Sequence, residues 1–286
     1  MIRVLQVPYD SGFRDQRMGR GPSCLVASGA MERLVESAGA AERSTVEYDG
    51  DFPTENATAF ALQRMISEQV RAAVARGEFP LVLAGNCNST VGALGGLGSR
   101  NPALIWFDAH GDFNTPETST SGFLDGMALA MVVGHCWRSM TGSVSGFRPL
   151  PEDRVALVGA RDFDDAEHER LRNSGVNLVR CEEIRDGGAA VALEPVLDGW
   201  SGQVDGVYLH IDVDVHDPQS APFNPYQPTG GLSPEEVRRC LTTAAGSFRI
   251  LGASVTAYAP DLDVARKGLG VGLDLISCLG GLARQQ

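Results

Sequence analysis

The sequence predicts an α/β fold in which a parallel sheet is covered by helices on both faces. Short apolar runs alternate with longer amphipathic stretches along all 286 residues. The short runs are apolar at successive positions, which is typical of strands buried on both faces. Hydrophobic residues make up 43% of the chain and charged residues 21%, as in an ordinary globular protein. These three observations together favour a layered α/β architecture.

The predicted elements follow one another in the order that such a fold requires. An apolar run over residues 2–7 predicts the first strand, which Pro8 ends. Helical spacing follows over residues 22–38 and again over 56–77. Further strands are expected over residues 79–84, 103–107, 154–158, 206–213 and 248–252. Because no repeat, low-complexity tract or linker interrupts this series, we expect one domain over residues 1–286.

Charge and cysteine usage exclude several classes of function. The formal net charge is −12, from 24 lysines and arginines against 36 aspartates and glutamates. Such a surface repels phosphate backbones, so we expect no nucleic-acid partner. No apolar run is long enough to cross a bilayer, and the first residues lack the layout of a signal peptide. The six cysteines are widely spaced, which indicates free thiols and a cytoplasmic protein without a membrane partner.

Two polar segments follow predicted strands and indicate a metal site. Asp108, His110 and Asp112 follow the strand at 103–107; Asp212 lies near the end of the strand at 206–213, and Asp214 directly follows it. Ligands of parallel sheets bind beyond the carboxyl ends of the strands. Carboxylates that converge there repel one another, and a divalent cation offsets that repulsion. An isolated Asp-x-Asp is weak evidence, but this pairing favours Mn²⁺, with Zn²⁺, Fe²⁺, Co²⁺ or Ni²⁺ as alternatives.

The same segments carry a family resemblance. Residues 108–122 resemble the DAHxDxNTP…SG signature of the arginase, agmatinase and formimidoylglutamase (ureohydrolase) superfamily. Residues 212–218, followed by Ala221-Pro222 and Gly230-Gly231, resemble its second signature, DxDxxDPxxxP…GG. Residues 20–22 and 159–168 are similar to two further family segments in the same order. The resemblance therefore covers most of the chain, as a divergent member.

The resemblance implies a three-layer α/β/α fold with an eight-stranded parallel sheet. It also implies two Mn²⁺ ions that share a hydroxide, a small-molecule substrate and a homo-oligomer. One ion would be held by a histidine and by the carboxylates of Asp108, Asp112 and Asp212. The other would be held by Asp108, His110, Asp212 and Asp214. Hydroxide activated by two metals can attack an amidine or guanidine carbon and release an amine.

The sequence departs from the family pattern at the first metal ligand. Counting from the strand at 79–84 and from Gly92 places Cys87 where the family has a histidine. Cys87 is either a thiolate ligand, which favours Zn²⁺ or Fe²⁺ over Mn²⁺, or a buried thiol that binds nothing. Asn88 is a further candidate if the loop is shifted. His210, two residues before Asp212, can support a ligand by a hydrogen bond, replace the missing imidazole or simply pack beside the site.

Other departures concern the substrate. Asp125 stands at the position of a proton-shuttling histidine, and we expect it to be catalytic. Phe123 replaces an asparagine that binds the substrate carboxylate in arginases, and Ala257 replaces an acid that holds the guanidinium. Asp164 and Glu167 match positions that contact the substrate amino group, although acids near a helix start can also be structural. L-Arginine is therefore disfavoured as a substrate.

The resemblance, together with these departures, implies a metal-dependent hydrolase that cleaves a C–N bond in a linear amidine- or guanidine-like molecule. One alternative is a one-metal, deacetylase-like amidohydrolase that uses Asp108, His110 and Asp214. A second alternative is a catalytically silent binding paralogue that keeps the fold. The number of bound metal ions, two, one or none, distinguishes the three hypotheses.

Overall fold

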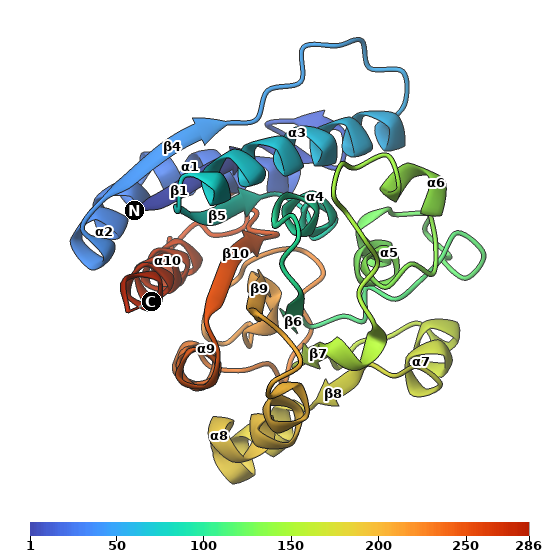
Figure 1. Cartoon of the computed structure of the whole chain (residues 1–286), viewed down its shortest axis with the longest axis vertical. Helices are drawn as coiled ribbons and strands as arrows, with labels where there is room; N and C mark the ends of the chain where they lie inside the picture. The colour runs from blue at the N-terminus through green and yellow to red at the C-terminus, as the bar shows by residue number, and fades with distance from the viewer. Residues whose placement is uncertain (286) are drawn as a thin grey trace.

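A single parallel sheet of eight strands organises the chain (Figure 1). The structure is a computed structural model that describes residues 1–285. The strand order is β4-β1-β5-β10-β9-β6-β7-β8, and neighbouring strands pair in parallel. The strands are β1 (Ile2–Val7), β4 (Ala41–Thr45), β5 (Phe79–Ala84), β6 (Pro102–Phe107), β7 (Val155–Val158), β8 (Asn177–Val179), β9 (Gly206–Asp212) and β10 (Ile250–Thr256). A separate antiparallel pair is formed by β2 (Tyr9–Asp10) and β3 (Phe13–Arg14).

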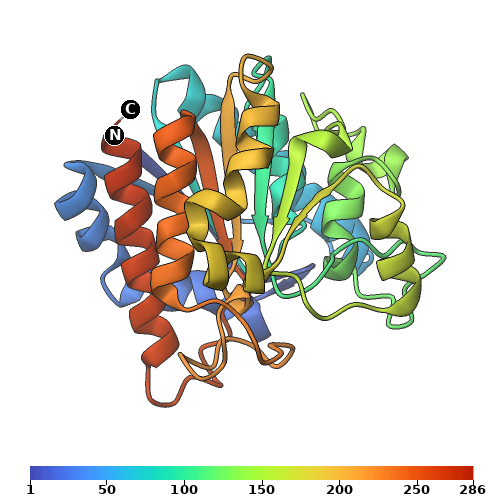
Figure 2. The same ribbon diagram turned by 90° about the horizontal axis from the view of Figure 1, so that it is seen from below.

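Helices cover both faces of the sheet, which confirms the predicted three-layer fold. One face packs against α1 (Gly21–Ala27), α2 (Ala30–Ala38), α8 (Cys181–Trp200), α9 (Pro234–Ser247) and α10 (Lys267–Arg284). The other face packs against α3 (Glu55–Ala75), α4 (Ser89–Gly96), α5 (Ala128–Val132) and α7 (Asp165–Arg172), with α6 (Arg138–Thr141) beside them. Figure 2 shows α9 and α10 side by side in front of the strands. Within residues 1–285, no helix combines the length and the apolar character that a membrane crossing needs.

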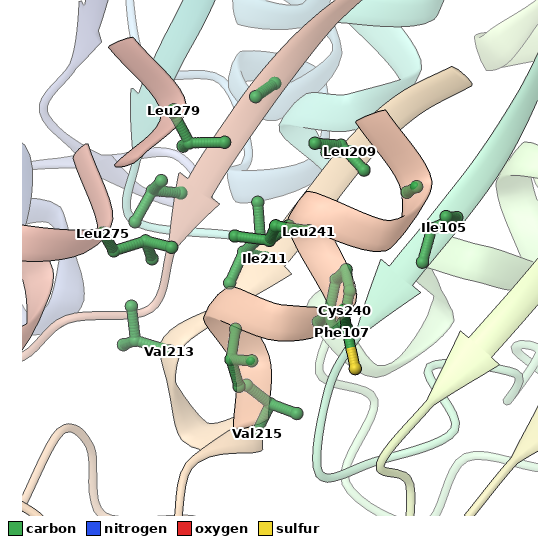
Figure 3. Packing of buried hydrophobic residues seen from close by; sticks show 14 of the residues in the cluster. Ile105, Phe107, Leu209, Ile211, Val213, Val215, Cys240, Leu241, Leu275 and Leu279 are labelled. Atoms are coloured by element: carbon green, nitrogen blue, oxygen red, sulfur yellow. The ribbon is translucent and has the colours of Figure 1, made fainter. Parts of the chain in front are cut away.

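The central strands β6 and β9 are buried along their whole length. Their alternating side chains separate the two faces of the sheet. Figure 3 shows Ile105, Phe107, Leu209 and Ile211 of these strands among Cys240, Leu241, Leu275 and Leu279 of α9 and α10. Trp106 and His210 point to the opposite face, where His210 bonds to Thr90 of α4. This face therefore carries a polar side chain in the interior just before the strands end.

The structure differs from the sequence prediction mainly at the edges. The edge strands β4 and β8 were not predicted individually, because the polar, half-exposed sequence of β4 (AERST) contains no apolar run and β8 is only three residues long. The helical stretch at 22–38 is divided at Gly29, which adopts a φ of +105°. Strand β10 begins later than predicted and continues to Thr256. That extension places Ala257 directly at the carboxyl end of the strand.

Candidate metal centre

The candidate site lies where the carboxyl ends of the central strands meet. Strands β5, β10, β9 and β6 are consecutive neighbours in the sheet. Cys87 follows β5, Ala257 follows β10, Asp212 ends β9, and Asp108 follows β6. Because the strands are parallel, these residues gather at one edge of the sheet. Segments more than a hundred residues apart in the chain thus share one site.

A cavity of about 500 Å³ opens at this edge. Seven carboxylates line it, and within the described part of the chain no lysine or arginine does. Cys87 and His110 contribute to its floor, together with several neutral side chains. The acidic lining comprises Asp112, Asp125, Asp162, Asp164, Glu167, Asp212 and Asp214. The cavity therefore favours a cation over an anion.

Asp108, His110 and Asp214 form a compact cluster, of which His110 and Asp214 line the cavity. Nδ1 of His110 lies 3.3 Å from Oδ1 of Asp108 and 3.3 Å from Oδ2 of Asp214. One potential ligand atom from each residue lies within 4.8 Å of the others. Burial lowers the pKa of His110, but attraction to Asp214 and Asp108 outweighs burial and raises that pKa well above its ordinary value. The three side chains thus already converge on a space that suits a cation.

Hydrogen bonds hold the carboxylates of this cluster in place. Trp106 Nε1 donates to Oδ2 of Asp108 at 2.9 Å, and the backbone N–H of Ala109 donates to Oδ1 of Asp214 at 3.1 Å. Asn224 Nδ2 donates to Oδ2 of Asp214 at 3.0 Å. Such outer contacts orient metal ligands and fix their direction. The sequence analysis missed Asn224, because an asparagine in a loop carries no periodic signal; Trp106 was detectable only by its spacing from Asp108.

Asp112 and Asp212 bring further buried oxygens to the cluster. Asp212 Oδ1 accepts the backbone N–H of Asp214 at 2.8 Å. Asp112 adopts a φ of +49°, and its buried Oδ2 has no hydrogen-bond partner. Burial first, and neighbouring carboxylates second, raise the pKa values of Asp108, Asp112 and Asp212 above the ordinary range. A divalent ion would satisfy the orphaned oxygen and offset the repulsion, so these residues fit the metal centre that the sequence predicts.

Cys87 lies beside the cluster, as the sequence predicts. Its thiol donates to Oδ2 of Asp212 at 3.0 Å and lies 3.3 Å from Oγ1 of Thr256. Burial, followed by repulsion from Asp212, raises the pKa of the thiol well above its ordinary value. The side chain of Asn88 instead contacts Gln63 of α3 at 3.4 Å. The loop thus presents Cys87 rather than Asn88 to the cavity; whether the thiol binds metal stays a prediction.

Asp125 lines the cavity close to Cys87. Its two carboxylate oxygens accept hydrogen bonds from Nδ2 of Asn86 at 2.7 Å and from the backbone N–H of Asn88 at 3.1 Å. Burial outweighs these bonds and raises the pKa of Asp125 to about 7. A carboxyl group with such a pKa can both take up and release a proton near neutral pH.

Asp164 and Glu167 line the side of the cavity, next to the start of α7. Glu167 accepts the backbone N–H of Phe113 at 2.7 Å and that of Asp164 at 3.3 Å, so it also holds this segment together. Burial raises the pKa of Glu167 to about 7. Asp164 is exposed, and its Oδ2 accepts Nδ2 of Asn114 at 3.0 Å. Of the two predicted substrate contacts, Asp164 is the one that keeps an accessible carboxylate.

One wall of the cavity is apolar. Met18, Ala257 and Ala259 form a small buried cluster against which Phe123 packs. The Phe123 ring also lies 6.0 Å from the ring of Tyr226, centroid to centroid. Arg17 lies over the outer side of Phe123 at 5.9 Å, but its guanidinium is paired with Asp10 at 2.8 Å. The positions of Phe123 and Ala257 thus present hydrocarbon to a ligand. The sequence identified Phe123 and Ala257 but gave no sign of Met18 and Tyr226, which reach the wall from distant loops.

Both the sequence and the fold of this chain are similar to those of known proteins. The sequence profile of the Arginase family matches residues 1–280. The chain is 32% identical to an arginase of Bacillus caldovelox, over 98% of both chains, and 30% identical to an arginase of Bacillus subtilis, over 98% of this chain and 97% of that one. It is similar to a crystal structure of the Bacillus subtilis arginase with a TM-score of 0.88 at 29% identity, over 98% of both chains. The chain therefore belongs to the arginase family.

Proposed function

We propose that this protein is a metal-dependent hydrolase that cleaves a C–N bond in a small cationic amidine or guanidine. The observation that carries the proposal is the convergence of the half-buried His110 with the buried carboxylates of Asp108 and Asp214, next to the buried Asp212, at an acidic cavity. The membership of the arginase family and the arginases among its relatives support the same class of reaction.

The floor residues would hold the metal, and the remaining residues act on the substrate and its protons. Asp108, His110, Asp212 and Asp214 present mainly oxygen donors, which suit Mn²⁺. When bound, divalent metal activates a water molecule as the nucleophile. Hydrogen bonds from Trp106, Ala109 and Asn224 keep the carboxylates in one orientation, so little reorganisation is needed.

Asp125 is placed to exchange protons inside the cavity. Its pKa of about 7 allows the carboxylate to take a proton and the carboxylic acid to give it to a departing amine. Asn86 and Asn88 donate hydrogen bonds to its two oxygens, so Asp125 is held against the loop that carries Cys87. Asp125 thereby takes the role that a histidine has at this position in the family.

The cavity favours substrates that carry positive charge and lack a carboxylate. Seven carboxylates line it, and within the described residues no lysine or arginine offsets them there. Phe123 offers no hydrogen bond to a substrate carboxylate, and Ala257 offers no anion to a guanidinium. Asp164 remains available for a substrate amine at the side of the cavity. A linear cation with an apolar stem along Met18 and Phe123 fits this distribution.

The test compares L-arginine with guanidines and amidines that have the same chain length and no carboxylate. The Mn²⁺-loaded protein should hydrolyse L-arginine with a kcat/KM at least about a hundredfold lower than its best carboxylate-free substrate, because two buried contacts are missing. Released urea, ammonia and amine are measured, and Asp108→Asn serves as the control for contaminating activity. Urea release from L-arginine as fast as from any carboxylate-free compound would contradict the proposal.

A substitution at Ala257 sharpens this test. Ala257→Glu returns a carboxylate to the cavity wall and should increase kcat/KM for guanidines. Ala257→Gln is the matched control, since it adds a similar volume without the charge. If the two variants behave alike, charge at this wall does not select the substrate.

The compactness of Asp108, His110 and Asp214 favours a second candidate, a one-metal amidohydrolase. This set alone provides one nitrogen and two carboxylates, which is enough for a catalytic site with an open position. Metal analysis of protein purified without chelator distinguishes the candidates: two ions per chain support the first and one ion supports the second.

A further inference from the structure

His210 carries an unpaired nitrogen in the interior of the protein. The residue is completely buried on β9, and its ring stacks on Trp106 with the centroids 3.7 Å apart. Nδ1 is occupied by the hydroxyl of Thr90 at 2.8 Å and that of Ser254 at 2.9 Å. Nε2 has no hydrogen-bond partner among the described residues. Buried polar nitrogens are almost always paired, so an orphaned one points to a partner outside the chain, such as an ion or a water molecule.

The surroundings of this ring supply further donors. A ring nitrogen of His210, Sγ of Cys87 and a carboxylate oxygen of Asp108 all lie within 4.8 Å of one another, and all three residues are buried. They come from β9, from the loop after β5 and from the end of β6. This group shares Asp108 with the cluster of His110 and Asp214 but is otherwise separate from it.

We propose that His210 Nε2, Cys87 Sγ and Asp108 form a binding position for Zn²⁺, Fe²⁺ or Co²⁺ next to the carboxylate-rich position. This inference rests on the metal centre proposed above and identifies the ligands and the preferred metals of its second position. Sulfur and imidazole donors favour these softer ions, whereas the oxygen-rich set of His110, Asp212 and Asp214 suits Mn²⁺. The centre would thus hold two different metals.

The contacts around His210 are those that a ligating imidazole requires. With Nδ1–H donating to a hydroxyl of Thr90 or Ser254, the lone pair of Nε2 is free for a metal. Stacking on Trp106 prevents the ring from turning. This assignment also explains two unusual positions together. Cys87 stands where the family has a histidine, and His210 of β9 supplies the imidazole that is missing there.

Cobalt binding tests the proposal without any substrate. Metal-free protein is titrated with Co²⁺, and absorption in the near ultraviolet reports a bond between the thiolate and cobalt. The wild type should show this thiolate-to-cobalt band, and Cys87→Ser should lose it. Cys136→Ser is the matched control, because this buried thiol lies outside the cavity and should leave the band unchanged. Cobalt binding without the band in the wild type would overturn the proposal.

The part of His210 is tested by His210→Gln, with circular dichroism to check the fold. Co²⁺ affinity at the thiolate position should fall at least about tenfold, and unchanged affinity would overturn the assignment. Should this variant not fold, X-ray absorption of the Zn²⁺-loaded wild type decides instead: a sulfur about 2.3 Å from zinc together with imidazole scattering is expected, and their absence overturns the proposal. Because neither readout involves catalysis, a failed hydrolysis assay would count against the proposed function alone.

Discussion

Asp212 connects the two halves of the candidate centre. One carboxylate oxygen accepts the backbone N–H of Asp214, and the other accepts the thiol of Cys87. The side chain is buried, and both burial and repulsion from Asp214 raise its pKa. In the metal-free protein this buried carboxylate therefore opposes folding, and in the metal-loaded protein we expect it to be a ligand.

Asp212→Asn should abolish metal retention without lowering the stability of the metal-free protein. The amide keeps an oxygen for the N–H of Asp214 and removes a buried charge. Metal content is measured by elemental analysis, and the free energy of unfolding by urea titration in chelator. Asp198→Asn, the same change at an exposed position of α8, is the control. Wild-type metal content in Asp212→Asn would show that Asp212 is not a ligand.

The residue scale also shows what sequence reasoning can reach. Asp108, His110 and Asp214 could be predicted because they follow apolar strands at regular spacing, and the structure brings them together. The orphaned state of His210 could not, because it depends on what surrounds the ring in three dimensions. Nothing in the spacing of Asn224 shows that its amide reaches Asp214.

At the scale of elements, Glu78 ties the start of β5 to β1 and to the end of α3. It accepts hydrogen bonds from Arg3 at 2.9 and 3.0 Å and from Arg76 at 2.9 Å. These bonds, those of Arg3 first, lower the pKa of Glu78 from 4.5 to about 2. Buried strands were predictable from their apolar runs; this anchor was not, because it joins residues far apart in the chain.

Glu78→Gln should lower the free energy of unfolding by about 1 kcal/mol at neutral pH, because two guanidinium groups lose their anion. In the folded protein the Glu78 carboxylate stays ionised at pH values at which the same group in the unfolded chain is already protonated. Its contribution is therefore complete above about pH 4.5 and disappears as the pH falls through about 2.

Urea unfolding of wild type and Glu78→Gln between pH 7 and pH 3 measures this dependence. The difference between the two proteins should shrink as the pH falls. Glu42→Gln, which removes the exposed partner of Arg3, is the control and should have a smaller effect. A difference that stays constant over this range would contradict the role of the ionised carboxylate.

At the scale of the whole molecule, the acidic centre concentrates part of the negative charge of a chain whose net charge is −12. Bound cations should therefore stabilise the folded protein as a whole. Mn²⁺ at a hundred times its Kd should add about 2.7 kcal/mol to the free energy of unfolding. Chelator should lower the Tm and Mn²⁺ should restore it, as followed by thermal unfolding.

Sodium chloride at matched ionic strength separates this effect from general screening, because it reduces long-range repulsion without filling the centre. Asp212→Asn should give the same Tm with and without Mn²⁺. A wild-type Tm that does not respond to Mn²⁺ would show that the centre does not bind the ion in the folded state.

The position of β10 in the sheet also bears on how the chain is made. β10 lies between β5 and β9, although it is the last strand to leave the ribosome. Until it emerges, the half with β4, β1 and β5 and the half with β9, β6, β7 and β8 cannot join, and each exposes an unpaired edge. Open edges of this kind pair readily with other chains. The nascent protein thus passes through an aggregation-prone interval that ends only when β10 (Ile250–Thr256) has been synthesised and can pair with both halves.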